Sequence, residues 1–383
     1  MIGGHAVKNP FTFKELPIDA PFCDREKELK DLISHAANNV NVVLFSPRRY
    51  GKTSLIKRVQ ARLVQKGFVA VYIDFFGIDS TEDVAARLAS QLYAFCHKNE
   101  SMFQKAMRFM SSWRPVIKPD MYDGLSITAE PVGHKKGMDI LDETLSQLGK
   151  FAAENDTQFH IVLDEFQEIT ELPDSLKIEG MVRSHIQTHQ NVSYFFVGSR
   201  RRILIDIFNE KKRPFYKSAI SCKLAPLPKG EAIAFIVERF SSGGKKCPED
   251  IAEMVFDYVN GYPYYIQRIP YSIYEVSEKD TITRDDYVRG ALQTMEDEKT
   301  IYEALIGALS IQHIKLLSAL AHESTASLFS ANYMARHGLG SVGGVQGALK
   351  KLITLDYIEK RDDGVFCVVD PVFALWLNHL KKN

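Results

Sequence analysis

The chain has 383 residues, which exceeds the size at which a single hydrophobic core usually stops growing, so we expect two or three domains. Its 48 basic residues balance its 48 acidic residues, which argues against a strong overall field towards nucleic acid or anionic lipid. Five scattered cysteines without a C-x-x-C pair argue against a disulfide framework and against a zinc site. We expect a cytoplasmic protein without membrane insertion, because the sequence shows neither a secretory signal nor a long apolar run.

In chain order, short apolar runs alternate with amphipathic segments over the first part of the sequence. Asp24 stands where an N-cap is expected, before a segment with leucine and isoleucine at helical spacing. Residues 40–45 are almost entirely apolar, which is typical of a strand buried on both faces. This alternation predicts an α/β fold with a parallel sheet covered by helices. Further strands are expected at 68–76, 159–163, 192–197 and 219–224, and helices at 52–66 and 81–110.

Two regions differ from this alternation. Residues 111–137 contain several prolines and glycines and are too long for a routine connection, so we expect a surface excursion such as a hairpin. From residue 229 the pattern is helical, and near the end two short strands are joined by Asp362-Asp363-Gly364, a good hairpin turn. Three helices followed by a hairpin are typical of a winged helix. We expect a sheet-containing core at 1–226, a helical lid at 227–297 and a winged helix at 298–383.

A phosphate-binding pattern lies between an expected strand and an expected helix. Residues 46–53 match G-x-x-x-x-G-K-[ST], except that serine replaces the first glycine. Backbone N–H groups at a helix start wrap an anion, and Gly51 lets the chain approach phosphates closely. Lys52 supplies a mobile positive charge for the β- and γ-phosphates, and the Thr53 hydroxyl is a hard oxygen ligand for Mg²⁺. The predicted nucleotide-binding segment comprises Ser46, Pro47, Arg48, Arg49, Tyr50, Gly51, Lys52, Thr53 and Ser54.

Two alternatives apply to this segment. The Gly-Lys-Thr could be accidental in a basic loop, but the strand before it and the helix after it are the context that the pattern requires. Arg48 and Arg49 could be phosphate ligands, but exposed arginines near a loop more commonly face solvent or a partner, and we favour that second interpretation.

A second motif is an apolar strand that ends in Asp164 and Glu165. The carboxyl ends of parallel strands meet at one edge of the sheet, so both carboxylates are expected beside the phosphate loop. There Asp164 would hold Mg²⁺, and Glu165 would act as general base on the attacking water. Acidic pairs after a strand also occur as helix N-caps, but the Gly-Lys-Thr upstream favours the catalytic role.

Gly198-Ser199 ends another expected strand. Ser199 is a candidate partner of the water or the γ-phosphate, and a helix N-cap is the equal alternative. Arg200 and Arg201 follow at a helix start, where positive charge opposes the helix dipole. That mild cost suggests a contact to phosphate or to a neighbouring subunit.

Taken together, these motifs resemble the archaeal-type ATPases of the AAA+/STAND assemblage over nearly the whole chain. The C-terminal residues 370–377 are similar to the winged-helix tail of that group, whose layout resembles that of origin-recognition initiator ATPases. The segments that carry the similarity are 22–26, 46–53, 163–167, 198–199, 224–227 and 261–263.

The resemblance implies an ASCE-type nucleotide domain that binds ATP or ADP with Mg²⁺, followed by a helical lid and a winged helix. It places adenine between the segment from Phe22 to Arg25 and the lid near Pro263. It also implies an arginine that acts in trans on a neighbouring subunit. Arg213 and the run 200–202 are the comparable positions, although Arg213 also fits a solvated basic loop. Pro263 stands where many members have a sensor arginine, which leaves Arg268 as a substitute; the candidate catalytic residues are Lys52, Glu165, Ser199 and Arg213.

A winged helix reads DNA by laying a helix, here about 342–353, in the major groove while the wing meets phosphate. Asp362 and Asp363 at the wing tip would repel phosphate, and basic and acidic residues nearly balance after residue 301. So few phosphate contacts predict weak, salt-sensitive binding, and a protein-contact module is nearly as well supported. The candidate DNA contacts are Lys350, Lys351, Lys360 and Arg361.

Two functions therefore remain open. The first is a Mg²⁺-dependent ATPase of slow turnover that associates with duplex DNA and assembles there as a homo-oligomer. The second is a signalling switch of STAND type, in which ADP holds a closed monomer and ATP opens it towards a protein partner. A small-molecule P-loop kinase is less well supported, because the extra length forms a lid and a winged helix rather than an acceptor-binding lid.

Overall fold

The computed structural model describes residues 8–18, 20–96, 100–120, 124–133, 136–154 and 158–380. The chain forms two compact units. The first, here called the sheet unit, comprises Arg25–Ser46 and Lys52–Leu224. The second, the helical unit, comprises Met1–Asp24, Pro47–Gly51 and Ala225–Asn383. The middle of the predicted phosphate loop therefore belongs to the helical unit, while its two ends belong to the sheet unit.

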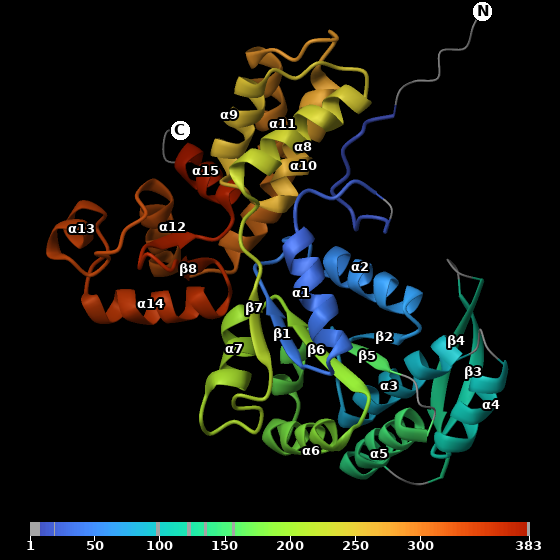
Figure 1. Cartoon of the computed structure of the whole chain (residues 1–383). Helices are drawn as coiled ribbons and strands as arrows, with labels where there is room; N and C mark the ends of the chain where they lie inside the picture. The colour runs from blue at the N-terminus through green and yellow to red at the C-terminus, as the bar shows by residue number, and fades with distance from the viewer. Residues whose placement is uncertain are drawn as a thin grey trace, which may run out of the picture. The chain divides into compact units, whose positions relative to one another are not determined.

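Five parallel strands form the centre of the sheet unit, which confirms the predicted α/β fold (Figure 1). The strand order is β2-β5-β6-β1-β7, so β6 lies between the strand before the phosphate loop and the strand that ends in the acidic pair. The bounds are β1 Val42–Phe45, β2 Val69–Asp74, β5 Phe159–Asp164, β6 Val192–Gly198 and β7 Ile220–Lys223.

Helices cover both faces of this sheet. Val43, Ile161 and Phe196 lie in one hydrophobic core with side chains of α3, α5, α6 and α7. Because side chains alternate along a strand, neighbours such as Val42 and Leu44, which are also buried, belong to the opposite face, where α1 and α2 pack together. The helices are α1 Glu26–Ala37, α2 Lys52–Gln65, α3 Thr81–Cys96, α4 Glu100–Phe109, α5 Met138–Glu154, α6 Ser175–Thr188 and α7 Arg201–Asn209, with the short 3-10 helix η1 Phe166–Glu171.

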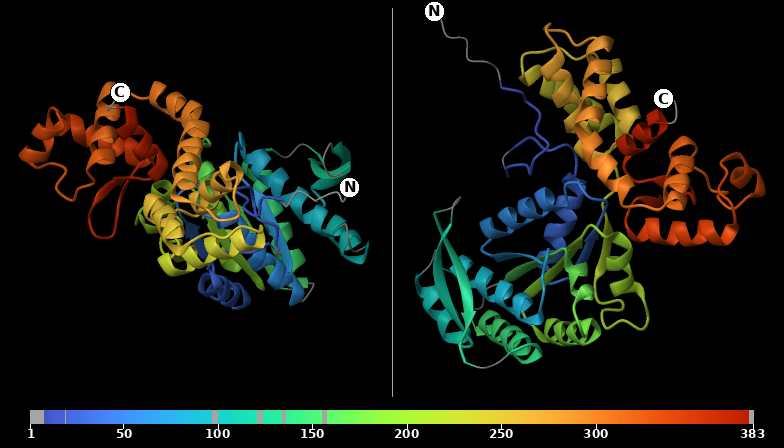
Figure 2. Two further views of the ribbon diagram at one scale, coloured as in Figure 1. Left: turned by 90° about the horizontal axis from the view of Figure 1, so that it is seen from above. Right: turned by 180° about the vertical axis from the view of Figure 1, so that it is seen from behind.

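The predicted excursion is a two-stranded antiparallel hairpin of β3 Trp113–Asp120 and β4 Gly124–Pro131. It lies beside α3 and α4 in all views (Figure 2). Trp113 is buried at its base, and its indole N–H donates a hydrogen bond to Thr144 Oγ1 at 2.8 Å. The Tyr93 hydroxyl donates to the Trp113 carbonyl at 2.9 Å. These two bonds anchor the hairpin in the core of the sheet unit.

One local prediction is wrong. Asp24 does not cap α1: the N-cap position is Arg25, whose φ of 80° is left-handed and whose side chain makes no capping hydrogen bond. Asp24 is left-handed as well, with φ 55°, so the chain turns over two residues and the helix begins only at Glu26. The segment 81–110, which has a helical pattern, forms two helices, α3 and α4, and residues 97–99 between them lie outside the described residues.

The lid region of the helical unit is helical, as predicted. An N-terminal segment packs on it: the Phe11 ring lies 4.7 Å from that of Phe240, and Arg239 Nη2 donates to the Pro10 carbonyl at 2.6 Å. The proposed boundary after residue 297 falls inside α11, which runs without a break towards the C-terminal part. The helices are α8 Lys229–Ser242, α9 Glu249–Val259, α10 Pro263–Val276 and α11 Arg284–Gly307.

The last part of the helical unit has the predicted order of a winged helix, namely three helices and then a hairpin. Ser310, Ser330 and Ser341 each accept a hydrogen bond from a backbone N–H of the helix that follows, which fixes the three helix starts. Within the described ranges, no helix is both long and apolar enough to cross a membrane. The elements are α12 Ile311–His322, α13 Ala331–Arg336, α14 Val342–Thr354, β8 Ile358–Lys360, β9 Phe366–Val368 and α15 Pro371–Leu380.

Candidate active site

The sheet brings three of the predicted polar segments to one edge. In the parallel register, Phe45 is opposite Gly198, and β5 pairs with β6 so that Leu163 is opposite Phe196. Ser46, Ser199 and the acidic pair therefore all follow the carboxyl ends of neighbouring strands. This is the edge at which parallel α/β sheets bind ligands.

Lys52, the first residue of α2, is buried. Its Nζ donates hydrogen bonds to the Ser46 carbonyl at 3.1 Å and to Ser46 Oγ at 3.4 Å. The Lys52 ammonium therefore contacts Ser46, the serine that replaces the expected first glycine. Ser46 consequently provides a side-chain contact that a glycine could not make.

Tyr72 connects the two residues predicted to hold the metal. Its hydroxyl donates a hydrogen bond to Asp164 Oδ2 and also interacts with the Thr53 hydroxyl. The Asp164 carboxylate and the Thr53 hydroxyl therefore both contact the same tyrosine hydroxyl. Both are hard oxygen ligands of the kind that Mg²⁺ prefers. Burial raises the pKa of Asp164, while the hydrogen bonds from Tyr72 and from the Glu165 backbone N–H, and the charge of Lys52, oppose that rise.

Glu165 is held at the same edge by two neighbours. Ser199 Oγ donates to it, 3.1 Å from each carboxylate oxygen, and the Gln167 amide donates to Oε2. The backbone of Glu165 is left-handed, with φ 49°, at the start of η1. Neither of the N-cap alternatives is found: Glu165 makes no side-chain capping bond, and the N-cap of α7 is Arg200, not Ser199. The geometry therefore joins Ser199 to Glu165.

The middle of the phosphate loop lies in the helical unit. Arg49 and Gly51 have φ of 62° and 82°, and such left-handed residues turn successive backbone N–H groups to one side, as an anion nest requires. The Tyr262 hydroxyl donates to the Arg48 carbonyl at 2.7 Å, and the Tyr50 ring packs edge-on against that of Tyr262 at 4.7 Å. Tyr262 at the start of α10 thus fixes the backbone of the loop at Arg48 and packs against Tyr50.

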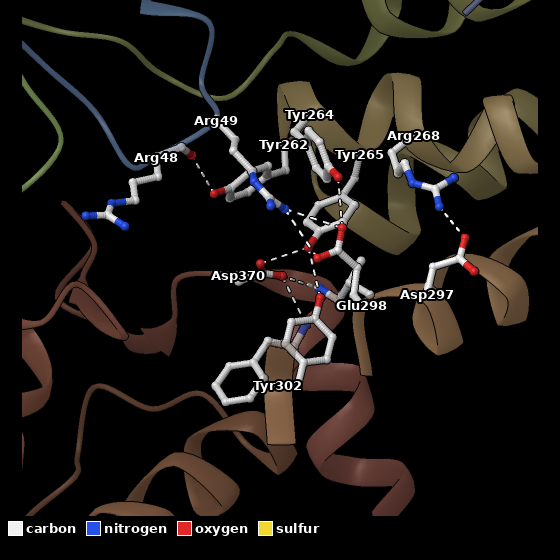
Figure 3. Close-up of polar contacts among 12 residues, drawn as sticks. Arg48, Arg49, Tyr262, Tyr264, Tyr265, Arg268, Asp297, Glu298, Tyr302 and Asp370 are labelled. Atoms are coloured by element: carbon white, nitrogen blue, oxygen red, sulfur yellow. Dashed lines mark hydrogen bonds and ion pairs between the residues drawn. The ribbon is translucent and has the colours of Figure 1, made fainter. Parts of the chain in front are cut away.

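Arg49 has a partner within the chain, although we favoured a solvated or partner-facing side chain for it. Its Nη1 lies 3.4 Å from both carboxylate oxygens of Glu298, and its guanidinium lies 4.3 Å from the centre of the Tyr264 ring (Figure 3). The neighbouring Arg48 is exposed. A single carboxylate on a long helix, such as Glu298, gives no sequence signal that it faces a loop 249 residues away.

The other predicted arginines are also engaged. Arg200 pairs with Glu168 and Glu171 of η1, and Arg213 pairs with Glu179, which is completely buried. These contacts are made within the sheet unit, so a role of Arg213 in trans would require this pair to break. Burial raises the pKa of Glu179 to about 7, and the charge of Arg213 opposes that rise.

The remaining predicted residues near the nucleotide occupy ordinary structural positions. Phe22 is half-buried, and Arg25 is buried and pairs with Glu28 at 2.8 Å. Pro263 is the first residue of α10, where its missing N–H costs nothing. Arg268, the substitute sensor, pairs with Asp297 and lies 4.7 Å from the centre of the Phe13 ring. The contacts of Arg268 are therefore those of a residue that fixes the lid.

The four candidate DNA contacts are all exposed on the winged helix. Lys350 and Lys351 belong to α14, while Lys360 and Arg361 belong to the wing. Arg361 lies 3.8 Å from Asp363, and Lys360 Nζ lies 5.3 Å from the centre of the Phe366 ring. The acidic wing tip thus competes with any phosphate for Arg361.

The sequence patterns did not reveal three residues that contact predicted site residues, namely Tyr72 and Gln167 in the sheet unit and Glu298 in the helical unit. Tyr72 is a partly buried residue between the buried Val71 and Ile73 on β2. Gln167 lies two residues after Glu165. The position of Tyr72 was in principle available from strand pairing, because β2 lies beside β5.

Comparisons with known proteins agree with this architecture. A family described as an ATPase domain predominantly from Archaea matches residues 22–269, and a probable winged helix domain matches residues 300–379. Among solved structures, a Walker-type ATPase of Pyrococcus abyssi is similar with a TM-score of 0.67 and 20% identity, over 93% of this chain and 96% of that chain.

Two structures from Aeropyrum pernix are also similar. The ORC2 protein, in ADPNP-ADP complexes, has a TM-score of 0.55 and 15% identity, over 97% of this chain and 98% of that chain. The ORC1 protein, in complex with DNA, has a TM-score of 0.50 and 14% identity, over 97% of this chain and 96% of that chain. At such low identities these likenesses show the fold alone. A comparison with curated proteins finds no match.

Proposed function

Because this chain belongs to the family of ATPase domains found predominantly in Archaea, we propose that it binds ATP with Mg²⁺ at residues 46–53 and hydrolyses it slowly. The observation that carries the proposal is the grouping of Lys52, Thr53, Asp164 and Glu165 at one sheet edge, linked through Ser46, Tyr72 and Ser199. A lysine, two hard oxygen donors and a positioned carboxylate are the groups that phosphoryl transfer to water requires.

In binding, the loop and α2 neutralise the triphosphate. Lys52 exchanges its two Ser46 contacts for phosphate oxygens, and the backbone N–H groups at the start of α2 complete the anion site. Mg²⁺ would be held by Thr53 and Asp164 and would neutralise charge that develops on the β- and γ-phosphate oxygens. Tyr72 would orient both groups, because its hydroxyl donates to Asp164 and accepts from the Thr53 hydroxyl.

In hydrolysis, Glu165 accepts a proton from the attacking water as the oxygen of that water bonds to the γ-phosphorus and the bond to ADP breaks. Ser199 and Gln167 fix the direction of the carboxylate, so that the base does not depend on a mobile side chain. The products are ADP and phosphate, and the proton passes from Glu165 to solvent.

The test is a pair of substitutions with matched controls. Lys52→Ala should abolish Mg²⁺-dependent binding of a fluorescent ATP analogue, whereas Lys66→Ala, just beyond the same helix, should bind as the parent does. Glu165→Gln should retain binding but lose turnover by at least about 100-fold, the usual share of a general base. Glu168→Gln, three residues later and paired with Arg200, is its control. Equal turnover in Glu165→Gln and the parent would refute the role of Glu165.

We further propose that the winged helix contacts duplex DNA through phosphates rather than through base edges. Lys350, Lys351, Lys360 and Arg361 supply a small positive surface. Binding should weaken steeply with salt, with a slope set by about four phosphate contacts. Fluorescence anisotropy of a labelled duplex over a salt series, with and without nucleotide, measures this slope.

The composition of α14 favours a second candidate, a switch whose winged helix binds protein. Gly343 and Gly347 lie on this helix, and apart from the adjacent residues and the helix's own backbone no described atom lies within 4 Å of the point where a Cβ would stand on either. The first helical residue, Val342, is 46% exposed. The start of the helix that would enter the major groove therefore offers few side chains able to read bases. Indifference to DNA, together with a nucleotide-dependent change in hydrodynamic size, would favour this candidate.

A homo-oligomer with Arg213 acting in trans is a separate part of the proposal. Arg213 would have to leave Glu179 to reach the nucleotide of a neighbouring subunit. The Lys52→Ala variant retains Arg213, and an Arg213→Ala variant retains the nucleotide site. If Arg213 acts in trans, a mixture of the two variants should regain part of the turnover that each has lost. Absence of any regain at saturating protein would refute action in trans.

A further inference from the structure

Arg49 lies in the phosphate loop but makes its side-chain contacts with the lid and with α11. Its guanidinium stacks on Tyr264 and faces both oxygens of Glu298, and the Tyr264 hydroxyl donates to Glu298 Oε1 at 2.8 Å (Figure 3). Glu298 is only 7% exposed, while Arg49 is 44% exposed. The carboxylate is thus desolvated and depends on its two partners, whereas the guanidinium can still reach solvent.

A second set of buried hydroxyls continues from this pair to the winged helix. Tyr265, next to Tyr264 on α10, donates to Asp370 Oδ2 at 2.8 Å and contacts the Tyr302 hydroxyl at 2.9 Å. Asp370 Oδ1 accepts from the backbone N–H groups of Val372 and Phe373 at 2.9 and 3.0 Å, so it caps the start of α15. The rings of Tyr264 and Tyr265 lie 4.9 Å apart, and the charges of Glu298 and Arg49 both act on Asp370. Through these contacts one polar cluster joins the phosphate loop, α10, α11 and the last helix of the winged helix.

The chemistry of Arg49 allows two competing partners. A guanidinium binds a carboxylate and a phosphate with the same planar fork, so a phosphate held by the loop and the Glu298 carboxylate compete for one group. If the phosphate wins, Glu298 is left buried with a hydroxyl donor alone, and a buried carboxylate that loses its cation is strongly destabilised. Phosphate binding would then loosen the polar cluster that holds α11 and α15.

We propose that Arg49 is a positioning residue that relays phosphate binding at the loop to the lid and the winged helix, by exchanging Glu298 for phosphate. This inference rests on the proposed nucleotide site, since it names how that site is regulated. The direction of the effect follows from linkage: a change at Glu298 that weakens its pair with Arg49 must strengthen phosphate binding, because phosphate and Glu298 compete for Arg49. A purely structural role for Glu298 predicts the opposite, since a damaged lid binds less well.

The chain supplies a matched control one residue away. Asp297, also on α11, pairs with Arg268 of α10, a buried arginine whose guanidinium also donates to Ser272 on its own helix. Glu298→Gln keeps an acceptor for the Tyr264 hydroxyl and removes only the charge that holds Arg49. Asp297→Asn makes the same chemical change at a pair that does not involve the loop.

The first experiment measures binding of a non-hydrolysable ATP analogue with Mg²⁺ to the full chain. Glu298→Gln should bind at least about fivefold more tightly than the parent, and Asp297→Asn should not. Unchanged or weaker binding by Glu298→Gln, or equal tightening by Asp297→Asn, would overturn the relay. If the parent itself showed no Mg²⁺-dependent binding, the proposed nucleotide site would fail first, which is a distinct result.

The second experiment follows hydrogen exchange in peptides from the start of α15. In the parent, the analogue should raise exchange of the amides that Asp370 caps, and in Arg49→Gln these amides should exchange fast before the analogue is added, because Glu298 stays buried without its cation. In Glu298→Gln no buried charge is left unpaired, so these amides should exchange slowly and should not respond to the analogue. Adding Glu298→Gln to Arg49→Gln should restore slow exchange, as expected for one interaction. Fast exchange that persists in the double variant, or α15 exchange that ignores Arg49→Gln, would refute the relay.

Discussion

Gly198→Ala offers a sharp test of how Glu165 is positioned, because Gly198 ends β6 without being part of the chemistry. A Cβ at this position would lie 2.0 Å from Gln167 Oε1 and 3.1 Å from Leu204 Cδ2. Gln167 is completely buried, so its amide must move by more than about 1 Å to restore ordinary van der Waals separation. That movement removes the hydrogen bond from Gln167 to Glu165.

The size of the effect follows from these contacts. Overpacking of a buried position by one methyl group usually costs about 1–3 kcal/mol, so we expect a loss of stability in this range. Displacement of a catalytic carboxylate by about 1 Å can lower turnover by about 100-fold, and we expect a fall of about 10-fold to 100-fold in kcat with little change in nucleotide affinity. Chemical denaturation measures the first quantity, and steady-state phosphate release measures the second.

A second variant separates the clash from its consequence. Combined with Gln167→Ala, the added methyl group no longer meets the amide, and only its contact with Leu204 Cδ2 at 3.1 Å remains, so the double variant should be only slightly less stable than Gln167→Ala alone. Its kcat should stay low, because Glu165 still lacks the Gln167 contact. Parent-like stability and parent-like kcat in Gly198→Ala would show that Gln167 does not hold Glu165 in this way.

Three further predictions concern other parts of the chain. Burial lowers the pKa of His160 to about 3 from 6.5, so below pH 6.5 the unfolded chain binds more protons than the folded chain. The free energy of unfolding should therefore fall with decreasing pH, by up to about 1.4 kcal/mol per pH unit. His160→Asn should flatten this slope, as measured by acid denaturation followed by circular dichroism. Arg213→Gln should cost about 3 kcal/mol in urea denaturation, because Glu179 stays buried without its cation, and adding Glu179→Gln should restore most of that loss. Replacing Lys360 and Arg361 by alanine should lower the salt slope of DNA binding by about 2; an unchanged slope would exclude the wing from the DNA contact.

The sequence sufficed for features that depend on local pattern. The apolar runs predicted all five strands of the sheet, and the lone stretch of prolines and glycines at 111–137 predicted a hairpin. The edge that gathers Lys52, Asp164 and Glu165 follows from parallel pairing alone, since the carboxyl ends of the strands must then meet. These are consequences of periodicity and topology, which the order of residues determines directly.

Features that depend on distant pairing were beyond reach. The left-handed turn at Asp24 and Arg25 replaced a simple cap, because the backbone conformation before α1 is set by its surroundings. Glu298 lies in an acidic and basic run that is typical of a solvated helix face, yet it is buried against Arg49. Which of several similar charges becomes buried is decided by packing between elements far apart in the sequence.

The length of α11 restricts how the helical unit can move. With 24 residues, this helix is about 36 Å long, and it packs against α10 in the lid and against α15 in the winged helix. A tilt of about 10° at its first turns would carry its last turn through about 6 Å. The lid and the winged helix share this one rigid rod, so a small rotation at one end becomes a displacement of several ångströms at the other.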